Sequence, residues 1–180
     1  MNSFQLSQFE INPISERDGW RLCNFISSNS DFLKRYFPKT VAANLTPNLS
    51  SIFVEQKVSD FISGKEYLFT LKELEHRKII GLVYLKELKR SAKEAELAYC
   101  IAYPYKSNGF ASLAVQKISE WGFTEQHLKR LRIIVHKSNI GSIKVAENCG
   151  YLWKETLAKE HTPPNEDPLD MELYVLENER

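Results

Sequence analysis

The stretch EAELAYCIAYPYKSNGFAS, residues 94–112, decides how the chain folds. Its first half has the two-residue period of a strand, with Leu97, Tyr99 and Ile101 on one face. Pro104 ends the strand, because proline has no N–H to donate to a sheet ladder. A helical stripe follows after a short turn, formed by Phe110, Leu113, Ala114, Ile118 and Trp121. The chain therefore passes from a strand through a basic turn into a helix.

This turn is suited to bind a phosphate group. The first N–H groups of a helix lack intrahelical partners, and the macrodipole adds about half a positive charge there. Gly109 leaves space where a diphosphate can lie against the backbone, Ala111 is small for the same reason, and Lys106 adds a positive charge. We expect main-chain N–H groups of this turn to hold the anion, and the expected binding residues are Lys106, Ser107, Asn108, Gly109, Phe110, Ala111 and Ser112.

A second block lies farther along the chain, Asn139-x-x-Ser142-x-x-Val145-Ala146-Glu147-x-x-Gly150-Tyr151. Together with Lys106-x-x-Gly109-x-Ala111, it resembles the acyl-CoA signature of the GNAT acetyltransferases. The serine at its fourth position is similar to the RimJ/RimL branch, which acetylates the N-termini of ribosomal proteins.

The first block departs from the family pattern at two positions. Lys106 replaces the usual Gln or Arg, so a point charge stands where a planar fork is common. Asn108 stands where Gly or a basic residue is common. Asparagine is the non-glycine residue that best tolerates a left-handed backbone, so we expect the turn to form with Asn108.

The resemblance implies acetyl-CoA as the cofactor. It implies that two parallel strands, one ending at Ile101 and one starting at Arg130, splay apart to admit it. It also implies that the backbone of Cys100, Ile101 and Ala102 pairs with the pantetheine amides, and that Asn139 begins the helix beside the thiol.

Catalytic roles follow from the same resemblance. Ser142 is expected to protonate the leaving thiolate, since Ala146 stands where many GNAT enzymes have a tyrosine. For the base, Glu160 and Glu96 rank level, and His161 ranks third. The aromatic residues Phe32 and Tyr36 are expected to line the acceptor groove. The scattered His76, His127 and His136 have no metal spacing and are expected to be structural or solvated.

Composition limits the function class. The chain has 180 residues, of which 43% are hydrophobic and 26% charged, which is typical of a globular protein and allows a substantial core. We expect one domain over residues 1–180. A net charge of +1 does not suggest a nucleic-acid partner. No apolar run approaches the ~20 residues of a membrane span, and no secretory signal is visible.

The cysteines Cys23, Cys100 and Cys149 form neither a disulfide framework nor a zinc pattern. A reduced compartment fits them, so we expect a cytoplasmic enzyme without a metal, membrane or nucleic-acid partner. Whether the chain is a monomer or a homodimer stays open.

Periodicity along the chain predicts the element order β-α-α-β-β-β-α-β-α-β-β. This is a mixed α/β (α+β) fold, in which one mostly antiparallel sheet of about seven strands carries helices on both faces. The expected strands are residues 9–13, 67–72, 79–88, 94–101, 130–136, 151–158 and 169–176. The expected helices are 16–29, 46–63, one beginning at 110, and 140–149. Residues 31–38 are expected to form a loop.

These features predict an acetyl-CoA-dependent N-acetyltransferase that acts by direct transfer in a ternary complex. The expected acceptor, from the resemblance, is the α-amino group of a protein N-terminus. The alternatives are a small amine (a polyamine, amino acid or antibiotic) and a non-catalytic acyl-CoA sensor. A groove open at both ends favours a peptide, and a pocket closed beneath residues 32–38 favours a small molecule.

Overall fold

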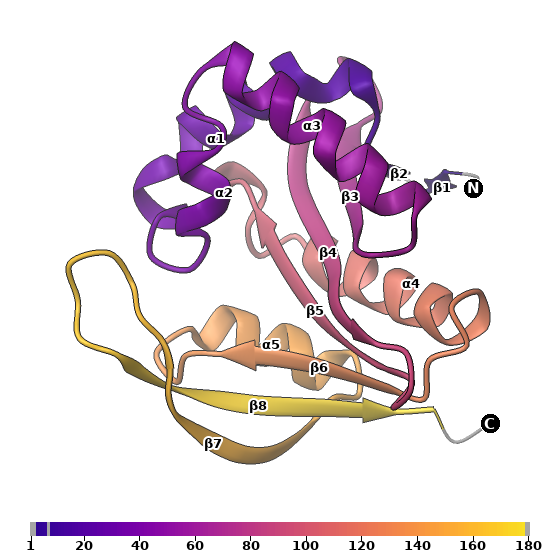
Figure 1. The fold of residues 1–180 in the computed structure, drawn as a ribbon, viewed down its shortest axis with the longest axis vertical. Helices are drawn as coiled ribbons and strands as arrows, with labels where there is room; N and C mark the ends of the chain where they lie inside the picture. Colours follow the sequence, from indigo (N-terminus) through magenta and orange to yellow (C-terminus); the bar gives the residue numbers. More distant parts are fainter. Residues whose placement is uncertain (1–2, 7, 179–180) are drawn as a thin grey trace.

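The computed structural model describes residues 3–6 and 8–178, which form one mixed sheet with helices on both faces (Figure 1). The strands are β1 (Phe4–Gln5), β2 (Phe9–Pro13), β3 (Tyr67–Glu73), β4 (Ile79–Lys89), β5 (Glu94–Ile101), β6 (Arg130–Val135), β7 (Leu152–His161) and β8 (Leu169–Glu177). The helices are α1 (Gly19–Leu33), α2 (Pro38–Ala42), α3 (Pro47–Ile62), α4 (Phe110–Thr124) and α5 (Ile140–Asn148), with 3-10 turns η1 (Glu16–Asp18) and η2 (Tyr103–Tyr105). The predicted fold class is confirmed.

The strands lie in the order β1-β2-β3-β4-β5-β6-β8-β7. Only β5 and β6 run parallel, and they pair at three positions, the last of which joins Glu96 to Arg132. Beyond this rung the two strands diverge, so the expected splayed pair is present (Figure 1). The sheet therefore consists of an N-terminal part and a C-terminal part joined by a short ladder.

Each face of the sheet has its own core. Helices α4 and α5 cover one face, where Val115, Ile118 and Ala146 pack against strand residues such as Leu97 and Ile133. Helices α1, α2 and α3 cover the other face, but only over the N-terminal part of the sheet (Figure 1). No helix of the described residues covers the same face of β6, β8 and β7 (Figure 1).

Three elements differ from the sequence-based prediction. The two-residue strand β1 adds an eighth strand, and β7 runs three residues past its expected end. The loop expected over residues 31–38 is wrong at both ends. Helix α1 continues through Phe32 to Leu33, which is buried, and Pro38 begins the short helix α2. Proline fits the first turn of a helix, where its missing N–H costs nothing.

Among the described residues, no helix has both the length and the hydropathy needed to cross a bilayer. In the same part of the chain, no three His, Cys, Asp or Glu side chains converge in a way that could hold a metal ion.

Candidate active site

The turn before α4 contains two residues with a left-handed backbone, Gly109 and Ser107. Gly109, at φ +78°, adopts the left-handed conformation that glycine allows, and a Cβ at this position would meet no atom within 4 Å. Glycine is therefore favoured at this position by its left-handed backbone and not by a lack of space for a side chain. The second left-handed residue is Ser107, at φ +64°, and not Asn108, for which the sequence predicted this role.

The N-terminus of α4 is open. The N–H of Leu113 is bonded to the carbonyl of Gly109, and no side chain caps the N–H groups of Phe110, Ala111 and Ser112. These three donors and the exposed residues 106–109 lie at one end of the opening between β5 and β6. Uncapped donors at a helix N-terminus suit a diphosphate, so the local structure fits the group that the sequence predicted.

Lys106 connects this turn to α1. Its Nζ lies 4.3 Å from the ring centroid of Phe32 and 5.1 Å from that of Tyr103, which is a cation–π arrangement. Phe32, predicted to line the acceptor groove, therefore packs beside the turn and holds the ammonium near it.

The edge of β5 that faces the opening has free backbone groups. Ala102 N–H donates to the carbonyl of Ile80 on β4, at 2.8 Å, so alternate residues of β5 point their backbone groups toward β4. Cys100 shares this direction, because it lies two residues before Ala102 along the chain, opposite Leu82 of β4. Of the three residues predicted to pair with pantetheine, Ile101 is thus the one whose N–H and C=O face the opening.

Ser142 lies across the opening from β5. Asn139 caps α5 by accepting a hydrogen bond from the Ser142 N–H at 3.2 Å, and the Tyr99 hydroxyl donates to the Ser142 carbonyl at 2.8 Å. Burial raises the pKa of Tyr99, which keeps this hydroxyl protonated as a donor. Within residues 3–6 and 8–178, the Ser142 hydroxyl itself has no hydrogen-bond partner. Its predicted role as an acid stays a prediction.

Glu96 lies at the last rung between β5 and β6. Its carboxylate is 2.8 Å from Lys86 Nζ and is almost fully buried. Two residues earlier on β5, Glu94 Oε1 is 3.1 Å from Arg132 Nε. The carboxylate predicted as a base thus belongs to a group of ion pairs where the two strands begin to separate.

A bulge in β7 decides which residue of this strand lies opposite Leu169 of β8. Between the pairs Leu157–Met171 and His161–Leu169, β7 advances four residues while β8 advances two. Lys159 takes a left-handed conformation, at φ +54°, and its N–H donates to the Asp170 carboxylate at 2.9 Å. After the bulge, His161 lies on the same face as Leu157.

Glu160 consequently lies on the opposite face from His161 and is exposed. The sequence placed Glu160 after the end of this strand, whereas it lies inside β7. Its role as a base stays a prediction, and the structure places the third-ranked His161 beside the other site residues.

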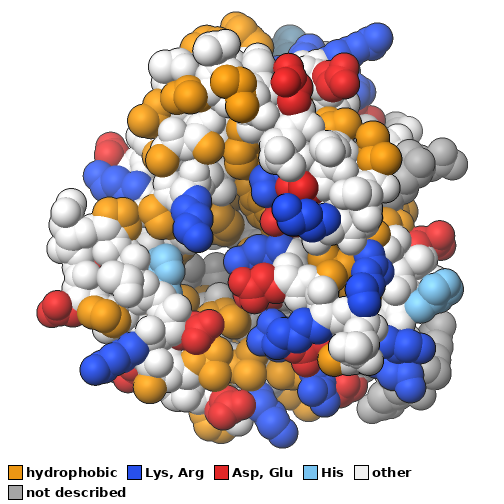
Figure 2. Space-filling model, viewed as in Figure 1, with side chains coloured by type: hydrophobic (Ala, Val, Ile, Leu, Met, Phe, Trp, Pro, Cys, Tyr) orange, Lys and Arg blue, Asp and Glu red, His pale blue; other side chains and the backbone are white. Residues whose placement is uncertain are grey.

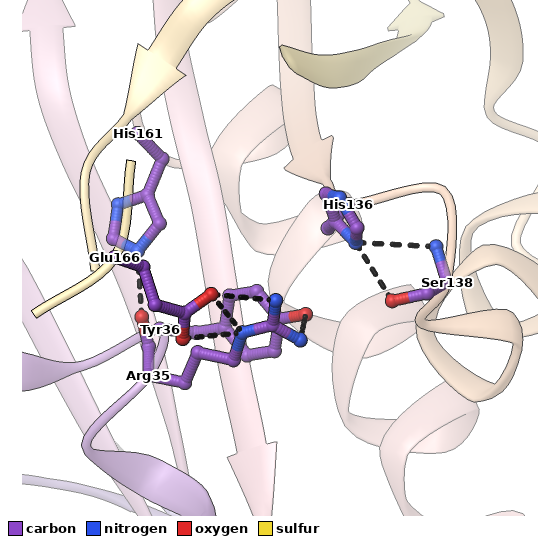
Figure 3. Close-up of polar contacts among 6 residues, drawn as sticks. All are labelled: Arg35, Tyr36, His136, Ser138, His161 and Glu166. Carbon is purple, nitrogen blue, oxygen red and sulfur yellow. Dashed lines mark hydrogen bonds and ion pairs between the residues drawn. The ribbon is translucent and has the colours of Figure 1, made fainter. Parts of the chain in front are cut away.

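Residues 34–37, which we call the strap, join α1 to the loop between β7 and β8 (Figure 3). The Arg35 guanidinium donates to both carboxylate oxygens of Glu166, at 2.8 to 3.2 Å. His161 Nε2 lies 2.6 Å from the Arg35 carbonyl, and a carbonyl oxygen only accepts, so this nitrogen carries the proton. Tyr36 extends from the strap, with its ring centroid 6.0 Å from that of His161.

A second histidine borders Tyr36. His136, which directly follows β6, has its ring centroid 6.5 Å from that of Tyr36. Its Nδ1 contacts the hydroxyl and the backbone N–H of Ser138, at 2.7 and 3.3 Å (Figure 3). From the sequence, His136 was expected to be structural or solvated, and Arg35 had no expected role in the site. The available signal for His136 was its position at the end of the strand that borders the opening.

The surface is hollowed between the helices α1 to α3 and the strands β6 to β8 (Figure 2). The uncapped N–H groups of α4 lie at one end of the site, and the strap crosses it with Tyr36. This arrangement can hold a nucleotide diphosphate at α4, an extended chain along the free edge of β5, and an amine beside Tyr36.

Comparisons with known proteins agree with this geometry. Residues 8–152 match the family model described as acetyltransferase (GNAT) domain. The chain is 26% identical over 142 residues to the spermidine N(1)-acetyltransferase of Escherichia coli K12, which covers 79% of this chain and 72% of the relative.

Two solved structures share the fold. The ribosomal-protein-S5-alanine acetyltransferase of Vibrio fischeri superposes with a TM-score of 0.93 at 23% identity, over 99% of this chain and 98% of the other. RimL, a ribosomal L7/L12 α-N-protein acetyltransferase in complex with coenzyme A, gives a TM-score of 0.88 at 14% identity, over 98% of both chains.

Proposed function

Because the chain belongs to the GNAT acetyltransferase family, we propose that it transfers the acetyl group of acetyl-CoA to the α-amino group of a protein N-terminus. The transfer is direct, within a complex that holds both substrates. The observation that carries the proposal is the divergence of β5 and β6 after Glu96, next to the uncapped N-terminus of α4.

Acetyl-CoA is held by the main chain. The N–H groups of Phe110, Ala111 and Ser112 bind the diphosphate, and the Lys106 ammonium lies close by, against Phe32. The backbone of Ile101 faces the opening, where it bonds to the pantetheine and polarises the thioester carbonyl. The thioester carbon then lies between β5 and α5.

Transfer forms a C–N bond and breaks a C–S bond. The Ser142 hydroxyl, which has no other hydrogen-bond partner in the described part of the chain, gives its proton to the leaving sulfur and takes up a proton from water. The proton that the amine loses goes to a base. We assign this role to His161, because its Nε2–H is held by the Arg35 carbonyl and its Nδ1 keeps the lone pair.

Glu160 and Glu96 are the other candidates for the base. Their test is a comparison of pH–rate profiles for His161→Gln, Glu160→Gln and Glu96→Gln. We expect His161→Gln to remove the alkaline rise in kcat/KM, while the other two variants keep it. An unchanged profile for His161→Gln contradicts the assignment, and the variant that loses the rise then identifies the base.

The likeness to ribosomal-protein acetyltransferases supports the protein N-terminus as acceptor. A small amine such as a polyamine is the second candidate. Two observations favour it: the identity to a spermidine acetyltransferase, and the strap, whose ion pair from Arg35 to Glu166 closes one side of the site.

Release of free thiol from acetyl-CoA distinguishes these functions. The acceptor panel contains N-terminal peptides of ribosomal proteins, the same peptides with a blocked α-amine, and spermidine. We expect release with the free peptides alone, and mass spectrometry should find the acetyl group on the α-nitrogen. A higher kcat/KM for spermidine than for every peptide refutes the proposed acceptor. Binding of acetyl-CoA without release on any amine indicates a sensor.

A further inference from the structure

His136 is a half-buried histidine that neither cofactor binding nor the proposed proton transfers use. It follows the last residue of β6, on the strand that borders the opening, and its ring lies beside Tyr36. Three residues after His136 comes Asn139, whose side chain caps α5 and positions Ser142. His136 thus lies between the wall of the acceptor site and the helix of the proposed acid.

The contacts of His136 fix its tautomer. A backbone N–H can only donate, so the contact from Ser138 N to Nδ1, at 3.3 Å, requires a lone pair on Nδ1. The Ser138 hydroxyl lies 2.7 Å from the same nitrogen. The neutral ring therefore carries its proton on Nε2. No described residue hydrogen-bonds to Nε2. One N–H donor is therefore left beside Tyr36.

The two histidines that flank Tyr36 are consequently the same Nε2–H tautomer, but each leaves a different nitrogen free. His161 uses its Nε2–H on the Arg35 carbonyl and keeps a lone pair on Nδ1. His136 uses its Nδ1 lone pair on Ser138 and keeps an N–H on Nε2. Ser138 already occupies the lone pair of His136, so the nitrogen left free on this ring can only donate, and it suits an oxygen acceptor better than it suits a base.

We propose that the Nε2–H of His136 donates a hydrogen bond to the first carbonyl oxygen of the acceptor and so determines specificity. An α-amino group is followed, one carbon later, by a carbonyl, whereas a polyamine carries methylene groups in that place. His136 therefore selects α-amino amides over amines without a carbonyl. This inference rests on the proposed function and adds a specificity-determining residue to it.

The test compares two acceptors that differ in one group. One is an alanyl peptide, and the other is the same peptide with its first amide replaced by an E-alkene, which keeps the shape but has no carbonyl oxygen. We expect His136→Ala to lower kcat/KM for the natural peptide about tenfold, the effect of one lost hydrogen bond, and to leave the alkene peptide unchanged. His136→Gln, whose side-chain amide can supply an N–H, should restore part of the loss.

A pH profile separates positioning from proton transfer. Because His136 acts as a donor, His136→Gln should keep the alkaline rise of the wild-type protein. If His136→Ala lowers kcat/KM equally for both peptides, or for neither, the inference is overturned. Thiol release by the wild type in that case leaves the proposed function intact. If the wild-type protein releases no thiol with the natural peptide or with the alkene peptide, both the inference and the proposed function are refuted. Thermal unfolding of each variant confirms that it is folded.

Discussion

The imidazole of His161 donates a hydrogen bond to the carbonyl oxygen of Arg35 across 2.6 Å, which joins the end of β7 to the turn after α1. These residues are 126 positions apart in the sequence. The Arg35 side chain continues from the same residue to Glu166, so both contacts hold the backbone that carries Tyr36. The proposed acceptor site is therefore bordered by the turn after α1 and by the end of β7, and its width depends on contacts at the surface.

The first prediction concerns this strap. Glu166→Gln removes the charge that Arg35 contacts but keeps a hydrogen-bonding group of the same size. We expect KM for the acceptor to rise about two- to fivefold, because the ion pair is partly exposed and therefore weak, while KM for acetyl-CoA stays constant. Initial rates with each substrate varied in turn measure this. Asp167→Asn, one residue farther along the same loop, is the control, and an equal change there contradicts the role of the pair.

Gly109 tests the anion site. Gly109→Ala places a side chain on a left-handed backbone, which should lower the free energy of unfolding by about 1 kcal/mol. Since the turn can relax only by moving its N–H groups, we expect the affinity for coenzyme A to fall at least about tenfold. Calorimetry and urea unfolding measure the two effects. Gly141→Ala, in the first turn of α5, is the control: its Cβ would lie 3.9 Å from Asn139 Oδ1, an ordinary contact, so it should keep the coenzyme affinity without lowering the free energy of unfolding. Unchanged coenzyme affinity in Gly109→Ala would place the diphosphate elsewhere.

Ser142 tests the protonation of sulfur. Ser142→Ala keeps the backbone N–H that Asn139 caps and the carbonyl that Tyr99 contacts, so α5 should stay in place. We expect kcat to fall about a hundredfold, as is typical when a general acid is lost, with KM for both substrates little changed. Stopped-flow thiol release gives the rate. Tyr99→Phe removes a contact to the same residue without removing its hydroxyl, and a comparable loss there would indicate that helix position explains the effect.

Buried acids give the protein a predictable response to alkali. Burial raises the pKa of the Cys100 thiol from 9.0 to about 12, and it also raises the pKa of Tyr84, Tyr99 and Tyr151. The unfolded chain ionises these groups first and binds fewer protons than the native state, so the free energy of unfolding is greatest below pH 9. It should fall between pH 9 and 12.

Urea unfolding from pH 8 to pH 11 measures this slope. Cys100→Ala should reduce the slope by about one proton, or about 1.4 kcal/mol per pH unit, once the unfolded thiol is fully ionised. An unfolding free energy that stays level up to pH 11 is the result that contradicts this reading of the buried groups.

Much of the fold could be predicted from local patterns. The two-residue period over residues 94–101, the proline that follows and the helical stripe after Gly109 defined β5, the turn and α4. Strand β1, with two residues, is too short to show a period. Helix α2 was missed because Pro38 indicates the end of a helix as readily as the start of one.

The acceptor side of the site could not be predicted in this way. Tyr36, His136 and His161 come from a turn and two strand ends, and only the curvature of the sheet brings them together. Glu160 and His161 are adjacent in sequence and so lie on opposite faces of β7, and the two extra residues of the bulge place His161 rather than Lys159 opposite Leu169. Such a bulge depends on the Asp170 carboxylate of the neighbouring strand, which no local pattern shows.

The three-rung ladder between β5 and β6 has a mechanical consequence. It makes this junction weaker than the two beside it, because β4 with β5 and β6 with β8 are paired along most of their length. In the proposed complex, a coenzyme lying in the opening takes the place of the missing rungs and stiffens the junction on both sides. The donor substrate is then also a structural part of the protein, and each turnover removes and replaces it.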